Sequence, residues 1–171
     1  PIDTFFGNGS FFIDSKNRLW LSYNNRIFLT DLQHTDQYIE FKPNEKGLKS
    51  SIITQIIEDR DHRIFITTRG DGLFLYEEEK KQFKNYNRHN SGIASNYCYE
   101  IAISTLGDLI ISGNKGISFF SPEHEDFRVI DLKSIPLTAI NIGCGLLVTK
   151  DGEIFVGGTN GFATFYELSL I

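Results

Sequence analysis

The strongest constraint on this chain is a pattern of apolar pairs that recurs at a spacing of 45 residues. The pairs are Leu19-Trp20, Ile64-Phe65, Leu109-Ile110 and Ile154-Phe155. The same spacing relates four short apolar runs just upstream, which begin at Phe11, Ile56, Ile101 and Leu146. A fixed period of about 40 to 50 residues is typical of repeat architectures with one supersecondary unit per period. The 171 residues therefore contain about four copies of one unit.

The second copy is the clearest, and its pattern predicts four short strands. Charged or glycine-containing turns separate the strand candidates, as expected between strands of a small sheet. Segments this short cannot hold helices of ordinary length. The predicted strands are Ile53–Asp59, Ile64–Thr68, Leu73–Tyr76 and Gln82–Tyr86.

The strands at 64–66 and 109–111 are apolar on both faces, which indicates how the sheets pack. A strand with one wet face would alternate apolar and polar residues. A sheet that is covered on both faces fits the radial stacking of a β-propeller. We therefore expect an all-β chain, with one propeller-type region over residues 1–171 and an incomplete last blade. The expected four-stranded blades lie at about 10–42, 53–87, 98–132 and 140–171.

The predicted turns carry residues that tolerate a left-handed backbone. Asn17, His62, Gly107 and Gly152 share one position, just before the second strand of each copy. Asn and Gly, and less strongly His, accept positive φ where most residues do not. Asp14 and Asp59 open the same turns in copies one and two, where an Asx-turn is expected. A second glycine column, which Arg26 interrupts in copy one, precedes the third strand at Gly72, Gly116 and Gly161.

Composition excludes several classes of function. The net charge is −5, and basic runs are missing, so binding to nucleic acid is not expected. The mixed-sign segment Glu77–Lys81 is expected to be a solvated hairpin tip. Cys98 and Cys144 are expected to be buried free thiols within strand patterns, and the histidines lack ligand spacing, so no metal or cofactor is expected. No run of 18 apolar residues occurs, so this chain is not expected to contact a membrane. A chain without Met that begins at Pro1 is expected to be processed or cut from a longer one.

The segments Ser50–Tyr76 and Ser95–Phe120 resemble the two-component regulator propeller repeat, with its I-x-E-D-x-x-G-x-L-W core. Phe11–Ser22 and Leu146–Phe165 are similar to the same repeat. Copies three and four lack the Asp, and only Trp20 keeps the aromatic residue of the motif. The resemblance implies a periplasmic sensor propeller in an inner-membrane hybrid histidine kinase of a Bacteroides-type bacterium. It also implies that the ligand is an oligosaccharide released from a glycan, and that the kinase and regulator regions lie outside this chain.

In a four-stranded blade, the loops between the second and third strands lie at the same end as the linkers between blades, and they form a natural ligand surface. Amides and arginines suit sugar hydroxyls, and Tyr23 is placed to stack on a sugar ring. The alternative interpretation is that these are ordinary turn and surface residues. The candidate ligand-binding residues are Tyr23, Asn24, Asn25, Arg26, Arg69, Asp71, Asn114, Lys115, Thr159 and Asn160.

Two other functions compete with a non-enzymatic sensor. One is a protein-interaction propeller, and the other is a propeller glycan lyase or hydrolase. The carboxylates of Asp59 and Asp61 lie together, as acid/base pairs do, but the turn interpretation is favoured and no catalytic residue is assigned. An open arc of blades would expose an apolar face at each end, so we also expect the chain to self-associate.

Overall fold

A computed structural model describes residues 9–167, which form four antiparallel sheets. We call the sheets blades 1 to 4. Blade 1 contains β1 (Phe11–Ile13), β2 (Arg18–Tyr23), β3 (Arg26–Asp31) and β4 (Tyr38–Phe41). Blade 2 contains β5 (Ile52–Glu58), β6 (Ile64–Arg69), β7 (Leu73–Glu77) and β8 (Gln82–Tyr86). Blade 3 contains β9 (Cys98–Ile103), β10 (Leu109–Gly113), β11 (Gly116–Ser121) and β12 (Asp126–Asp131). Blade 4 contains β13 (Leu146–Val148), β14 (Glu153–Gly158) and β15 (Gly161–Tyr166).

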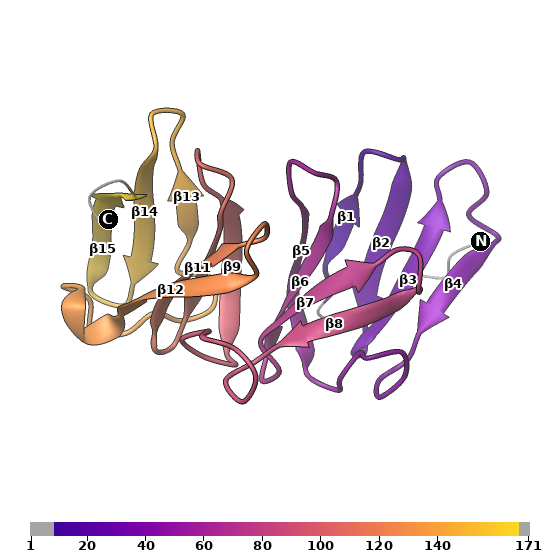
Figure 1. Ribbon diagram of the computed structural model, residues 1–171, viewed down its shortest axis with the longest axis horizontal. Helices are drawn as coiled ribbons and strands as arrows, with labels where there is room; N and C mark the ends of the chain where they lie inside the picture. Colours follow the sequence, from indigo (N-terminus) through magenta and orange to yellow (C-terminus); the bar gives the residue numbers. More distant parts are fainter. Residues whose placement is uncertain (1–8, 168–171) are drawn as a thin grey trace.

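Each blade is a meander in which every strand pairs with its neighbours in sequence, and consecutive blades stand side by side (Figure 1). The all-β propeller prediction is confirmed. Blade 4 has three strands within the described residues, and the last four residues of the expected blade at 140–171 lie outside them.

The turns and linkers lie at two opposite ends of the molecule (Figure 1). We call them the tip end, with the turns between the first and second strands, and the linker end, with the turns between the second and third strands and the linkers.

Each core lies between two blades, because every middle strand is apolar on both faces. Ile64 and Ile66 of β6 are buried against blade 1, whereas Phe65 between them is buried against blade 3. In β10, Ile111 packs toward blade 2 and Ile110 toward blade 4. Successive side chains of a strand point to opposite faces, so an uninterrupted apolar run serves two cores at once.

The innermost strands are joined by polar contacts near the middle of the molecule. A bulge in β5 frees Thr54, whose hydroxyl lies 2.9 Å from Thr67 Oγ1 and donates to the carbonyl of Cys98 at 3.0 Å. The Gln55 side-chain oxygen accepts the backbone N–H of Ile101 at 2.9 Å. These bonds fix β9 against blade 2 and satisfy buried polar groups that apolar packing would leave unpaired.

The turn predictions are confirmed in all four blades. Asn17, His62, Gly107 and Gly152 have φ of 58°, 63°, 99° and 89°. Gly116 carries φ of 136°, and an added Cβ there would lie 2.1 Å from the carbonyl oxygen of Ile130. At that position both the backbone angle and the close approach of the next strand require glycine.

Asp14 is the most enclosed carboxylate of these turns. It accepts the backbone N–H groups of Lys16 and Arg18, as expected of an Asx-turn, and also the Arg18 guanidinium at 2.7 Å. The buried Trp20 indole donates to its second oxygen at 2.9 Å. Burial alone would raise the pKa of Asp14, but the hydrogen bonds from Trp20 and Arg18 outweigh burial and lower it. Asp59 has the same bonds from Asp61, Arg63 and the Arg63 side chain.

Three details differ from the sequence prediction. Cys144 lies in a turn before β13 and is only half-buried, because its strand begins two residues later. Cys98 is buried, and burial raises the pKa of its thiol to about 12. The linker after blade 3 contains a short 3-10 turn over Leu132–Ser134, which the Asp131 side chain caps. Glu78 belongs to the exposed tip as predicted, but it also forms an ion pair with Arg18 across blades 1 and 2.

The outward faces of blades 1 and 4 expose apolar side chains. On blade 1, Phe11, Ile13 and Tyr38 are 75%, 52% and 60% exposed. On blade 4, Leu147 and Phe162 are 59% and 68% exposed. Equivalent faces of blades 2 and 3 are covered by the next blade.

We expect Asp14→Ala to lower the free energy of unfolding by about 3 kcal/mol, because it leaves the Trp20 indole and two backbone N–H groups without their acceptor. Denaturant unfolding followed by tryptophan fluorescence measures the change. Asp61→Ala is the matched control, since its exposed ion pair with Arg63 is worth less than about 1 kcal/mol.

The same site has a pH signature. The pKa of Asp14 is lower in the folded state than in the unfolded chain, so its contribution to stability is present above about pH 4. That contribution is lost as the pH falls through the folded pKa. Asp14→Asn should therefore lose stability less steeply than the parent chain on acidification, and parallel acid limbs would contradict the assignment.

Candidate functional site

The linker end gathers the ten predicted ligand-binding residues. Seven lie in the four turns between second and third strands, and Tyr23, Arg26 and Arg69 lie at the strand ends beside these turns. Asn24 and Asn25 form a tight turn with φ of 48° and 62°, and Arg26 forms an ion pair with Glu40 of β4. Tyr23 is half-buried. The structure therefore brings the predicted residues to one end but separates them among four blades.

Five of the predicted side chains hold the linkers in place, and three of these belong to blades 1 to 3. Asn25 donates to the carbonyl of Ser50 at 2.7 Å, and Asp71 accepts the N–H of Ser51 at 3.1 Å. Asn114 accepts the Ser95 hydroxyl at 2.6 Å.

Blade 4 repeats the arrangement. Asn160 accepts the backbone N–H of Thr138 at 2.8 Å, and the Thr138 hydroxyl lies 2.8 Å from Thr159 Oγ1. Each of these bonds joins a turn to the linker that enters the same blade or the next one. The amides of these turns therefore have a structural role, because they satisfy linker groups that are far away in sequence.

Arg26, Arg69 and Lys115 are the predicted residues that are both charged and exposed. Among residues 9–167, no carboxylate lies within 4.0 Å of the Arg69 or Lys115 side chain. Arg69 pairs through its backbone with Tyr97, which is 48% exposed at the start of blade 3. Tyr97 was not predicted as a site residue. An aromatic residue in a linker could have suggested a ligand contact. The exposure of Tyr97 could not be predicted, because it depends on how the linker crosses the end of β6.

The linker between blades 2 and 3 forms one wall of a groove of about 340 Å³. Arg88, Lys115, Asp131 and Ser91 supply polar groups to this groove, and Ile93 and Val129 supply apolar ones. Arg88 is held at its backbone by the Asn96 side chain, and one guanidinium nitrogen donates to the carbonyl of Ala94 at 2.8 Å. The other nitrogens of that guanidinium make no hydrogen bond or ion pair within the described part of the chain. A groove with an anchored arginine and a nearby lysine suits ligands with acceptor groups.

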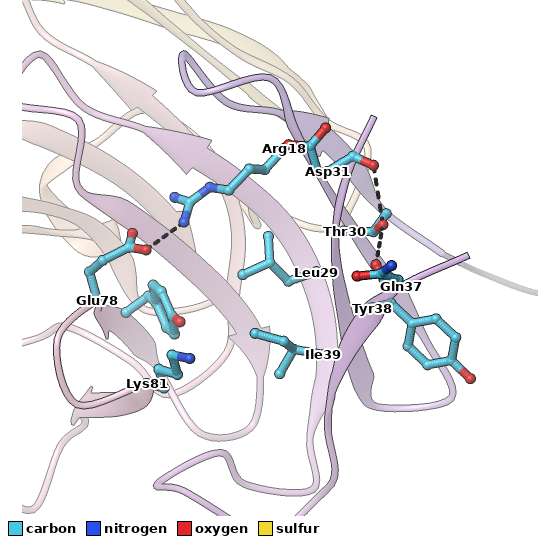
Figure 2. A pocket seen from close by; sticks show the side chains of 10 residues that line it. Arg18, Leu29, Thr30, Asp31, Gln37, Tyr38, Ile39, Glu78 and Lys81 are labelled. Carbon is cyan, nitrogen blue, oxygen red and sulfur yellow. Dashed lines mark hydrogen bonds and ion pairs between the residues drawn. The ribbon is translucent and has the colours of Figure 1, made fainter. Parts of the chain in front are cut away.

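A second pocket, of about 360 Å³, lies between blades 1 and 2 on the side of the tip end (Figure 2). Arg18 points across it toward Glu78, while Leu29 and Ile39 form an apolar wall. The hydrogen bond from Arg18 lowers the pKa of Glu78 against the opposing effect of burial. Because Arg18 already bonds both Asp14 and Glu78, the pocket joins two blades and leaves little of this cation for a ligand.

One cluster at the tip end resembles a catalytic arrangement in composition only. The Ser15 hydroxyl lies 2.9 Å from His62 Nδ1 and donates to Glu58 at 2.6 Å, while Glu58 lies 3.2 Å from the same ring nitrogen. In a catalytic triad the serine and the carboxylate contact different nitrogens of the histidine. The cluster therefore lacks triad geometry and links the turns of blades 1 and 2.

The comparisons with known proteins agree on the fold. No protein-family model and no curated protein matches the chain. Among solved structures, the chain is similar to the extracellular domain of a Bacteroides thetaiotaomicron protein described as a hybrid two component system, BT3049. The TM-score is 0.73 and the identity 16%, over 92% of this chain and 23% of that one. Virginiamycin B lyase of Staphylococcus aureus has a TM-score of 0.64 and 14% identity, over 92% and 54% of the two chains.

The WD40 β-propeller domain of Doa1 has a TM-score of 0.64 and 17% identity, over 92% of this chain and 49% of that one. The chain thus spans between about a quarter and about half of the length of these structures. At these identities the likeness establishes the β-propeller fold, which the extracellular domain of a two component system, a lyase and a WD40 domain share. Among residues 9–167, no helix is long and apolar enough to cross a membrane.

We expect Asn114→Ala to lower the free energy of unfolding by about 1 kcal/mol, because the hydroxyl of the buried Ser95 loses the acceptor of its hydrogen bond. Lys115→Ala next to it should change stability by less than about 0.5 kcal/mol, since its exposed side chain forms no hydrogen bond or ion pair with residues 9–167. Chemical denaturation of both variants separates the two roles. Equal losses would contradict the division between linker-holding and available side chains.

Proposed function

We propose that this chain is a ligand-binding part of an extracytoplasmic sensor propeller in a hybrid two-component protein. Its ligand is an oligosaccharide derived from a glycan, and the binding surface is the linker end. The observation that carries this proposal is the groove beside the linker of blades 2 and 3, which Arg88 and Lys115 line, together with Arg69 and Tyr97, which are exposed at the same end of the molecule. The similarity to the extracellular domain of BT3049 supports the sensor assignment.

The chemistry of these side chains suits a sugar. An exposed tyrosine offers an apolar ring face on which a pyranose can stack, and its hydroxyl can pair with a sugar hydroxyl. Arginine and lysine donate to hydroxyl and ring oxygens. The groove volume of about 340 Å³ lies within the range of small-ligand sites. The linker and blade 3 both contribute, so a bound ligand would touch parts of the chain that are far apart in sequence.

A catalytic role has less support. Asp59 and Asp61, the carboxylate pair considered for glycoside hydrolysis, have structural roles in their turn. Asp59 accepts two backbone N–H groups, and Asp61 forms an ion pair with Arg63. Both lie at the tip end, opposite the groove. The role proposed for this chain is therefore non-enzymatic binding, with signalling carried out elsewhere in the parent protein.

Calorimetric titration with a panel of plant and host oligosaccharides should give binding to at least one member. Tyr97→Ala should weaken that binding about tenfold, because it removes the stacking surface. Tyr38→Ala is the matched control, as this tyrosine is exposed on the outer face of blade 1. The absence of heat with every glycan would contradict the proposal, and so would glycan turnover by this chain alone.

The uncovered faces of blades 1 and 4 are proposed to pair two copies of the chain. We expect light scattering at high concentration to report a dimer or larger assembly, since exposed apolar sheet faces associate. Phe11→Lys combined with Phe162→Lys should shift the mass toward the monomer. Leu106→Lys, on an exposed turn at the tip end, is the control. A compact monomer of the parent chain would contradict this proposal.

A further inference from the structure

The charged residues of this acidic chain are divided unevenly between its two ends. The linker end contains eight Lys and Arg residues but only four Asp and Glu residues. It consists of residues 24–26, 40–51, 69–72, 87–97, 113–116, 131–145 and 158–161. The whole chain carries a net charge of −5, so the acidic excess belongs to the remainder of the molecule. A surplus of one sign at one end creates a field that attracts ligands of the opposite sign.

Most cations of the linker end have no carboxylate within 4.0 Å among residues 9–167. Arg26 is paired with Glu40, and Lys46 lies over the ring of Phe41. The six that remain are Lys42, Lys49, Arg69, Arg88, Lys115 and Lys133.

Three of the four carboxylates of this end have other partners. Asp71 accepts the N–H of Ser51, and Asp131 accepts the N–H of Lys133 as the cap of the 3-10 turn. Glu40 holds Arg26. The cations around the groove are therefore left to solvent by the fold itself. By contrast, Arg18, Arg63 and Arg128 on the other side of the molecule all contact carboxylates.

We propose that the oligosaccharide bound at the linker end is anionic, with carboxylate or sulfate groups. Arg88 and Lys115 in the groove pair with one acidic group, and Arg69 beside Tyr97 holds a second one while the tyrosine stacks on the sugar. This inference rests on the proposed glycan-binding function and specifies its ligand class.

Arginine fits this role because its guanidinium presents several donors in a plane, which matches the oxygens of carboxylate and sulfate. Arg88 has its backbone bonded to Asn96 and one nitrogen bonded to Ala94, so less side-chain entropy is lost when a ligand binds. Arg88 and Lys115 outnumber Asp131 among the residues that line the groove, so a neutral glycan would leave an excess of positive charge there. Discrimination between acidic and neutral sugars follows from that difference.

The test compares tetragalacturonate, a sulfated chondroitin tetrasaccharide and neutral β-1,4-linked galactotetraose by calorimetry on the whole chain. We expect one or both acidic probes to bind at least tenfold more tightly than the neutral probe. Raising salt from 50 to 500 mM should weaken acidic binding severalfold, because the exposed charges are screened. The carboxylated and sulfated arms identify which anion the site takes.

Arg88→Gln with Lys115→Ala should weaken acidic binding at least tenfold, whereas Lys150→Ala, an exposed lysine at the tip end, should leave it unchanged. Equal binding of neutral and acidic probes, or binding insensitive to the double variant, overturns the anionic assignment and leaves the glycan sensor intact. If no glycan binds, both proposals fail. Binding to duplex DNA or to phosphatidylglycerol vesicles as tight as to the acidic glycans also overturns it, since the surface would then select any polyanion.

Discussion

The fold depends on one constraint, which is that each sheet is apolar on both faces and is buried only by the sheets beside it. Phe65 and Ile66 are neighbours in β6, yet they belong to the cores on opposite sides of blade 2. No blade can be stable alone, because a single sheet with two apolar faces exposes one core for each missing neighbour. This packing also fixes the two ends of the molecule, because each turn is attached to strands that are held in place by the neighbouring blades.

The tip end shows how much of this the sequence could reveal. Positive φ at Asn17 and His62 and the Asx-turns of Asp14 and Asp59 followed from local residue chemistry, and the structure confirms them. Blades 3 and 4 lack the Asp, but another side chain accepts the backbone N–H groups of the turn. Ser104 accepts the N–H groups of Leu106 and Asp108, and Thr149 accepts that of Glu153. A hydroxyl can accept the N–H groups of the same turn. A sequence motif that requires Asp at this position therefore fails to recognise blades 3 and 4 as copies of the repeat.

The linker end was less predictable, because its contacts join residues that the repeat period does not relate. Asn114 bonds Ser95, 19 residues away, and Asn25 bonds Ser50, 25 residues away. A sequence pattern identifies polar turn residues but not which of them are already bonded. The set of predicted ligand contacts therefore divides into linker-holding amides and available cations, while Tyr97 enters from a linker that has no fixed place in the repeat.

This division also explains why charge can accumulate at one end without cost to the fold. The linkers there are fixed by neutral amides and hydroxyls, such as those of Asn114, Ser95 and Thr138, so the turns need no carboxylate beyond Asp71. Across the tip side, by contrast, arginine–carboxylate pairs join the blades, and Arg128 bonds both Asp108 and Glu167. Cations at the linker end thus contribute little to stability, and exposed ones repel each other weakly in water. Their placement around a groove is best explained by a ligand that supplies the missing negative charge.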